Sequence, residues 1–288
     1  MPLSFRTPSV LLQLFAEHLT VKFYSALLVL ASISLVLASP GLQKRASVND
    51  VATVGYAALG KTTGGAGGPQ TVVTTLDALT SAVTGNDPKI VIIQGTAVAS
   101  SYNVGKGATL QGVGLRVLNE QNVIIRNIAI KEVLASAGDA LGIQAASNVW
   151  IDHMDLSSNW AHDKVRCRHH GHVCLQLLRV LELAHPSFRF GTGHIFNNLY
   201  DNNADGINTR DGAQLLVENN VWNNNNTKPL YSTDEGFAVA TGNEFDSGSN
   251  EAPLGTFMSS KVPYSYSLVA INQVRSTVSA QAGATLSF

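Results

Sequence analysis

Short runs of β-branched and other apolar residues recur along the chain, and each run ends in polar residues instead of continuing with a helical period. Asn122 and Asn148 begin two of these runs 26 residues apart, and the later runs repeat at 22 or 23 residues. Self-similarity at such a period is typical of solenoids, in which each repeat packs against its neighbours. The sequence therefore predicts an all-β fold, a parallel β-helix. The recurring runs are Lys89–Gly95, Asn122–Ile130, Asn148–Leu156, His194–Tyr200, Leu215–Trp222 and Phe237–Phe245.

Asparagine and glycine stand where these runs end and a solenoid must bend. Asparagine suits such bends because it tolerates left-handed backbone geometry and its side chain can bond locally. We expect Asn197, Asn219 and Asn243 to stack as a ladder at one corner. The alternative is a β-sandwich with Asn-rich turns, but turns in a sandwich follow one another at about 8–12 residues. Before the first run, Thr71–Val83 is expected to form a strand and then a short helix with Asp77 near its start.

The composition narrows the classes of function. The chain has 288 residues, of which 45% are hydrophobic and 14% charged, and its net charge is −1. A core can be buried, whereas nucleic-acid binding has little electrostatic support without a basic excess. Two cysteines do not form a disulfide framework. We expect a monomer that binds neither nucleic acid nor membranes.

The N-terminal region has the features of a secretion signal. Lys22 precedes an apolar run that ends in small residues at Ala38. This run is shorter than the ~20 residues that span a bilayer, which favours a signal peptide over a membrane anchor. We expect an extracellular protein that carries a glycosylation sequon at Asn225. The expected parts are a leader and signal at 1–38, a pro-segment ending in a dibasic site at 39–45, and a β-helix domain at 46–288.

Three stretches carry distinctive motifs: Gly138–Ser158 has W-I-D-H, Arg189–Asn198 has R-F-G-T-G-H, and Asp205–Asn243 has N-T-R-D-G. These stretches cover most of the expected domain and resemble the fungal pectate lyases of polysaccharide lyase family 1. The resemblance implies a right-handed parallel β-helix that cleaves polygalacturonate by β-elimination. A base removes the C5 proton and the 4-O-glycosidic bond breaks, which leaves 4,5-unsaturated products. In the family an arginine is the base, and Ca²⁺ stabilises the developing negative charge.

The same resemblance assigns candidate site residues. Arg189, in R-F-G, corresponds to a catalytic-site arginine that binds a substrate carboxylate, and Arg210, in N-T-R-D-G, to another substrate-binding arginine of the cleft. A guanidinium suits this role because it can pair with a carboxylate through two hydrogen bonds. Asp152 and His153, in W-I-D-H, are expected to be structural or to support the site.

Asp139, in G-D-A, corresponds to a calcium-binding aspartate. Calcium takes six to eight oxygen ligands, so one carboxylate makes an incomplete site. Asp155 and Asp163 are the candidate further ligands.

The resemblance breaks off between Lys164 and Pro186. In the family this region supplies two more calcium aspartates, a substrate-binding lysine and the catalytic base, whose position is occupied here by Ala184. We therefore expect the base to be lost, catalysis to be impaired and the solenoid to be shortened by two to three coils. Residues 165–185 are interpreted as an aberrant segment, from intron or out-of-frame translation, with a genuine insertion as the alternative. Its leucine run, Leu175–Leu183, is expected to be helical.

Three other interpretations stay open. The aberrant segment contains a group of metal-binding residue types, which suggests a zinc site or a disulfide, although zinc ligands usually come in two closely spaced pairs. The chain also fits a non-catalytic β-helix that binds acidic polysaccharide through Arg189 and Arg210, and a pectin lyase that acts on methyl-esterified substrate without calcium. The residues of the group are Cys167, His169, His170, His172 and Cys174.

Overall fold

A computed structural model of the protein describes residues 46–98, 108–137, 139–158, 164–168, 172–181, 185–203, 205–224 and 226–288. It describes the backbone alone at residues 96–98, 135, 158, 164–168, 172–181 and 185. The expected signal peptide and pro-segment, Asp163, Ala184 and the sequon residue Asn225 lie outside the described residues, as do the side chains of Cys167 and Cys174.

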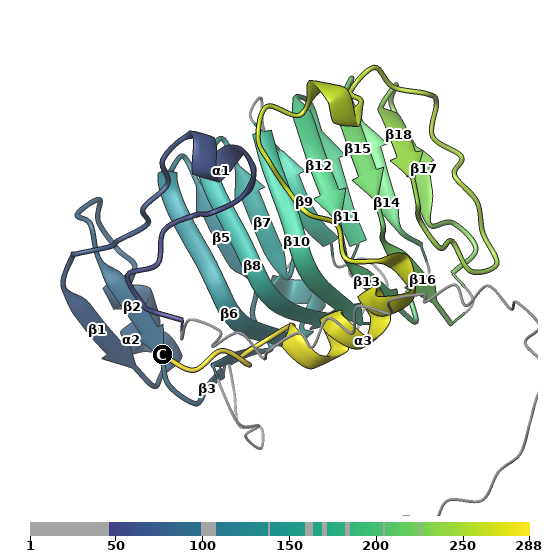
Figure 1. Ribbon diagram of the computed structural model, residues 1–288. Helices are drawn as coiled ribbons and strands as arrows, with labels where there is room; N and C mark the ends of the chain where they lie inside the picture. Colours follow the sequence, from purple (N-terminus) through teal and green to yellow (C-terminus); the bar gives the residue numbers. More distant parts are fainter. Residues whose placement is uncertain are drawn as a thin grey trace, which may run out of the picture. The chain divides into compact units, whose positions relative to one another are not determined.

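The regular secondary structure of the described chain is mainly β-strand, arranged in three sheets (Figure 1). The ten-stranded sheet contains β3 (Thr96–Val98), β4 (Thr109–Gln111), β6 (Gln121–Val133), β8 (Ser147–Ser158), β10 (His172–Leu181), β12 (Thr192–Phe196), β13 (Leu199–Asp201), β15 (Gln214–Glu218), β16 (Val221–Asn223) and β18 (Phe237–Thr241). The six-stranded sheet contains β5 (Leu115–Leu118), β7 (Leu141–Gln144), β9 (Lys164–Arg168), β11 (His185–Arg189), β14 (Ile207–Arg210) and β17 (Leu230–Ser232). The two-stranded sheet contains β1 (Gln70–Val73) and β2 (Ile90–Ile93). The helices are α1 (Gly55–Leu59), α2 (Leu76–Ala82) and α3 (Ile271–Gln281), and 3₁₀ turns lie at Ala135–Ala137 and Ser259–Lys261.

The named strands pair in parallel, and each pairs with the strand one repeat away in the sequence. Val149 on β8 pairs with Val123 on β6, and Leu215 on β15 pairs with Gly193 on β12. Every strand of the six-stranded sheet belongs to a different coil, so the described residues build about six coils. The predicted parallel β-helix is confirmed. The expected strand and short helix between Thr71 and Val83 are also confirmed, as β1 and α2.

The inward-facing side chains of both large sheets form one continuous core of aliphatic and aromatic residues. Gly193 on β12 faces this core, where a Cβ atom would lie only 2.7 Å from the ring of Phe188. Glycine is therefore required at this position by packing, because interiors have little free space for an added methyl group.

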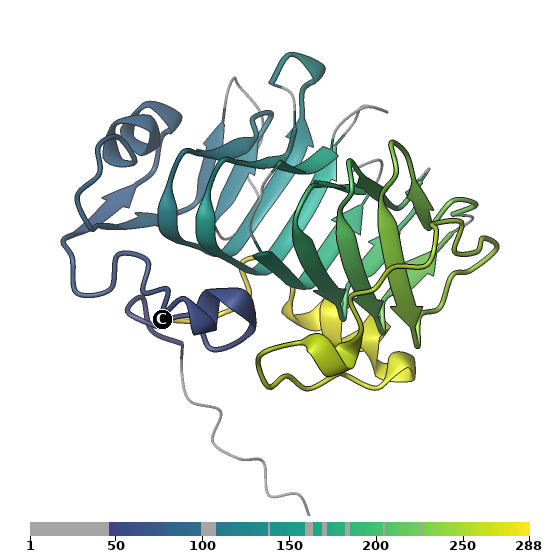
Figure 2. The same cartoon turned by 90° about the horizontal axis from the view of Figure 1, so that it is seen from above.

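The segments at the two ends of the described chain cover the ten-stranded sheet. Figure 2 shows α1 and α3 on the same side of the stack of coils. Val274 and Val278 of α3 are buried against Leu199 and Val221, whereas α1 packs against β8 and β10. None of the helices in the described part of the chain is long and apolar enough to cross a bilayer.

The prediction of a helix for the leucine run of the aberrant segment is wrong. The structure instead has β10, in which Leu175 pairs with Ile151 of β8 on one side and with Ile195 of β12 on the other. Backbone groups in a stack are satisfied by the coils above and below, and this tertiary pairing overrides the weak preference of leucine for helix. Together β9 and β10 supply one coil of the solenoid.

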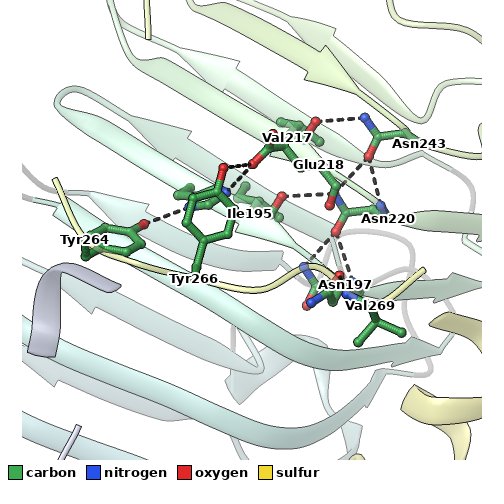
Figure 3. A network of polar contacts seen from close by, with 11 residues as sticks. Ile195, Asn197, Val217, Glu218, Asn220, Asn243, Tyr264, Tyr266 and Val269 are labelled. Carbon is green, nitrogen blue, oxygen red and sulfur yellow. Dashed lines mark hydrogen bonds and ion pairs between the residues drawn. The ribbon is translucent and has the colours of Figure 1, made fainter. Parts of the chain in front are cut away.

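The predicted asparagine ladder exists, but one residue later than expected in two of its three coils (Figure 3). The backbone N–H and Nδ2 of Asn198 donate to Oδ1 of Asn220, and the same groups of Asn220 donate to Oδ1 of Asn243. Asn197 and Asn219 have positive φ angles of 56° and 47°, and their side chains bond instead to the backbone of Val269 in the C-terminal segment. Because the side chains of Asn197 and Asn219 point toward the C-terminal segment, the residues that follow them, Asn198 and Asn220, enter the ladder.

Candidate functional site

Two arginines lie side by side at the C-terminal ends of strands in the six-stranded sheet. Arg189 ends β11 and Arg210 ends β14, and the two residues are register partners. The preceding residues, Phe188 and Thr209, are fully buried in the interior. Successive side chains on a strand point to opposite faces, so both arginines point outward from the coils, on strands about 4.8 Å apart.

Each arginine contacts an aspartate from the next coil. Nη1 of Arg189 lies 3.6 Å from Oδ2 of Asp211. Nε of Arg210 donates to Oδ2 of Asp234 at 3.0 Å, and its Nη2 donates to the same oxygen. The four side chains are between 23% and 53% exposed. Oδ2 of Asp211 itself is buried and has no hydrogen-bond partner among the described residues. Each of these two ion pairs joins one cation to one anion.

Further polar groups lie beside Arg210 on the outer face of β14 and β17. The hydroxyl of Tyr231 donates to Oδ2 of Asp205 at 2.6 Å, and Nζ of Lys228 lies 4.2 Å from the centre of the tyrosine ring. Thr233 donates to the side chain of Asn208 at 3.1 Å. Burial, and then the hydrogen bond to Asp205, raise the pKa of Tyr231. The tyrosine therefore stays neutral and acts as a hydrogen-bond donor rather than as a base.

The corner after each of these strands explains how the aspartates reach the arginines. Two consecutive residues with positive φ follow β11, β14 and β17, and the first residue of the last two pairs is the aspartate that contacts an arginine. Aspartate tolerates this conformation better than most residues. Asp211 and Asp234 were not predicted from the sequence, although R-D-G and T-D-E occupy equivalent repeat positions. The pairs are Phe190–Gly191, Asp211–Gly212 and Asp234–Glu235.

The structure does not bring the candidate calcium ligand Asp139 into the arginine row. Asp139 precedes β7, at the N-terminal ends of these parallel strands, whereas the arginines lie at the C-terminal ends. Asp155, the described candidate for a further ligand, has another partner. Asp155 lies on β8 of the other large sheet, 2.6 Å from Nζ of Lys131.

The described residues do not fit a calcium site. Calcium needs several oxygen ligands around one point. Among the side chains that the structure describes, no group of three or more His, Cys, Asp or Glu residues is placed to hold a metal ion.

Asp152 and His153 lie on the ten-stranded sheet, away from the arginines. Oδ2 of Asp152 accepts a hydrogen bond from Nε of Arg126 at 2.8 Å and lies 2.8 Å from Nδ1 of His153. Nη1 of Arg126 reaches Asp50 in the N-terminal segment at 3.0 Å, and its guanidinium lies over the ring of Trp150. This network anchors the N-terminal segment to the coils, in agreement with a structural role.

His194 lies under the C-terminal segment and has a strongly shifted pKa. His194 on β12 is fully buried, with Nε2 2.9 Å from Oε2 of Glu218 and Nδ1 2.7 Å from the hydroxyl of Tyr264 (Figure 3). Tyr266 donates to the same carboxylate oxygen at 2.7 Å. Burial lowers the pKa of His194 to about 4. The site is sealed by the C-terminal segment, so it holds the fold together and is not open to a substrate.

Comparisons with known proteins agree with this architecture. A sequence model of the pectate lyase family matches residues 176–287. A probable pectate lyase A from Aspergillus flavus is 42% identical, over 90% of this chain and 96% of the relative. The pectate lyase A of Emericella nidulans is 43% identical, over 85% of this chain and 90% of the relative. The chain belongs to the pectate lyase family.

Solved pectate lyases have the same fold at low sequence identity. A Bacillus sp. N165 pectate lyase in complex with trigalacturonate matches with a TM-score of 0.61 at 21% identity, covering 82% of this chain and 99% of that one. Pectate lyase C of Erwinia chrysanthemi, solved with Ca²⁺, matches with a TM-score of 0.57 at 18% identity, covering 83% and 99%. These matches establish a shared β-helix.

The alignment with the Aspergillus flavus pectate lyase also bears on the length of this chain. It spans 312 positions, whereas 90% of the 288 residues is about 259, so about 50 positions of the relative have no counterpart here. This difference agrees with the expected loss of two to three coils at the observed repeat. The family match begins at Gln176, inside the segment interpreted as aberrant.

Proposed function

We propose that the outer face of β11, β14 and β17 binds polygalacturonate, with Arg189 and Arg210 receiving carboxylates of the polysaccharide. The observation that carries this proposal is the register pairing of the two arginines on an outward-facing row. Guanidinium groups form strong, directional hydrogen bonds with carboxylates. Family membership makes the chain a polysaccharide lyase, so the reaction on the bound substrate is eliminative cleavage.

Elimination requires three events at the bound sugar. A base removes the proton from C5, the C4–O bond breaks with its electrons leaving on oxygen, and that oxygen gains a proton. The arginines contribute by stabilising negative charge at the C5 carboxylate as the proton leaves. Alanine, at the expected base position 184, cannot accept a proton. We therefore propose that this chain retains substrate binding and turns over slowly.

The family implies calcium, which would supply positive charge at the substrate carboxylate. The described carboxylates do not assemble its site. In this proposal, substrate binding by the arginine row is therefore independent of calcium.

The experiment measures binding and cleavage separately. Polygalacturonate is titrated into the protein with calcium and with a chelator, while ultraviolet absorbance follows the unsaturated product. Arg189→Met and Arg210→Met should each weaken binding about tenfold or more, since each loses a charge-assisted pair worth about 1.5–3 kcal/mol. The control is Arg275→Met, because Arg275 is an exposed arginine on α3. Equal affinity of all three variants would contradict the proposed site.

Two other functions give different results in the same experiment. Binding without any unsaturated product supports a non-catalytic acidic-polysaccharide-binding β-helix, which the alanine at position 184 favours. Preference for fully methyl-esterified pectin supports a pectin lyase, since esterification removes the charge that the arginines would recognise. We also propose that the protein is secreted and begins at Ala46, which N-terminal sequencing of the secreted form would test.

A further inference from the structure

We propose that Asp211 and Asp234 are positioning residues, each of which orients the arginine of the preceding coil for carboxylate binding. This inference rests on the proposed function of Arg189 and Arg210. Asp211 follows Arg210 in the chain, but its Oδ2 lies 3.6 Å from Nη1 of Arg189 in an ion pair without a hydrogen bond. One coil later, Asp234 accepts hydrogen bonds from Arg210. At two successive coils an aspartate thus lies beside the arginine of the preceding coil.

The backbone fixes where the two carboxylates lie. Asp211 and Asp234 have φ angles of 50° and 55°, at the first position of corners with two left-handed residues. The N–H of Asp211 donates to the carbonyl of Asp234 at 2.6 Å, and the N–H of Gly212 donates to the carbonyl of Glu235 at 3.1 Å. Neighbouring corners are therefore joined to each other. A short side chain on a fixed corner is a better anchor than a long flexible one.

This anchor acts on the arginine that would bind the substrate. A guanidinium has five N–H donors, and Asp234 uses two of those of Arg210, which leaves three. The bond along the Nε edge restricts the rotation of a side chain that is otherwise rich in rotamers. Binding of a carboxylate then costs less side-chain ordering, and affinity rises by about two- to tenfold through this effect.

If the aspartates acted only through their charge, their neutralisation would strengthen binding of the polysaccharide. Neutralising either aspartate would remove a negative charge beside its arginine, and a more positive surface would attract polygalacturonate more strongly. Under the positioning role, the same substitution weakens binding because the arginine loses its orientation. The direction of the change therefore separates a positioning residue from a competing carboxylate.

The test uses the full chain with trigalacturonate as the probe, titrated by calorimetry. Asp211→Asn and Asp234→Asn should each weaken binding about two- to tenfold. The matched control is Glu235→Gln, which removes the same charge from the same corner; Glu235 is exposed and has no arginine side-chain partner among the described residues. Its affinity should stay unchanged, and melting temperatures should show that all three variants are folded. An asparagine variant that binds as well as the parent chain, or more tightly, would overturn the inference.

Double variants separate this inference from the proposed function. Asp211→Asn should have no further effect in an Arg189→Met background, and Asp234→Asn none in an Arg210→Met background, because the aspartates act through the arginines. The preference for trigalacturonate over its methyl ester should fall in the single asparagine variants, which a purely structural role would not produce. If the arginine substitutions weaken binding and the asparagine ones do not, only the positioning role fails. If the arginine substitutions have no effect, both proposals are overturned.

Discussion

At the scale of single residues, buried His194 makes stability depend on pH. Burial lowers its pKa from 6.5 to about 4, although the facing carboxylate of Glu218 opposes the shift; the hydroxyls of Tyr264 and Tyr266 also face this pair. The unfolded chain therefore binds more protons between these two pH values. The stabilising contribution is complete above about pH 6.5 and decreases as the pH falls toward 4, by about 3 kcal/mol in all. Denaturant unfolding between pH 7.5 and 4 measures this loss.

The change with pH must be assigned to His194, because carboxylates also titrate in this range. His194→Gln keeps a donor and an acceptor but removes the titration. This variant should be less stable at pH 7 and should lose less stability on acidification than the parent chain. Parallel pH profiles of the two proteins would show that another group is responsible.

Asn220 is the central residue of the asparagine ladder. It is fully buried, accepts from Asn198, and donates to Asn243 and to the carbonyl of Ile195. Asn220→Ala leaves these buried groups without partners, so the free energy of unfolding should fall by about 3 kcal/mol. Asn86→Ala, at an exposed position, should change it by less than about 0.5 kcal/mol. Similar losses in both variants would contradict the structural importance of the ladder.

The sequence indicated which residue types would line the corners but not which of two adjacent asparagines enters the ladder. That choice depends on the left-handed backbone at Asn197 and Asn219 and on the C-terminal segment that binds them. The same limit applies to the site. The motifs named Arg189 and Arg210 as candidates, whereas the contacts of Asp211 and Asp234 depend on the register between coils.

At the scale of elements, α3 holds the C-terminal segment against the coils. Val278 is fully buried against the residues of β13 and β16. Val278→Asp would bury an unpaired carboxylate, so α3 should detach and the free energy of unfolding should fall by about 3 kcal/mol or more. Ser279→Asp, on the exposed side, is the control. Limited proteolysis should cut the Val278→Asp protein near the helix first, and equal resistance of both variants would contradict this anchoring role.

Elements were predictable where the pattern repeats and not where it is interrupted. The runs that begin at Asn122 and Asn148 became β6 and β8 because their apolar residues have a core to face. The leucine run lacks this repeat, and its sequence alone favours a helix. It forms β10 because it pairs with β8 on one side and β12 on the other. These strands are distant in the sequence, so the run itself does not reveal the pairing.

At the scale of the whole molecule, the segment interpreted as aberrant has the length of one coil. Lys164 on β9 pairs with His185 on β11, and His172 on β10 pairs with Thr192 on β12, so the chain advances by 21 and 20 residues in the two sheets. A solenoid is stabilised by contacts between neighbouring coils, so a coil of unrelated sequence can be accommodated when it keeps the register.

Removal of one whole coil should therefore be tolerated, whereas removal of half a coil should not. Deleting residues 164–184 joins β8 to β11 with the register of both sheets preserved, and we expect a folded, shorter solenoid with a cooperative melting transition. Deleting residues 164–173 removes β9 and the first residues of β10, so β11 loses its neighbour and the remaining coils no longer match the register of β7 and β8. The core is then exposed at this junction, and this variant should not fold. Circular dichroism and thermal melting compare the two deletions with the full chain. If the whole-coil deletion is unfolded, the contacts of β9 and β10 are indispensable and the segment is an integral part of the fold, whatever its origin.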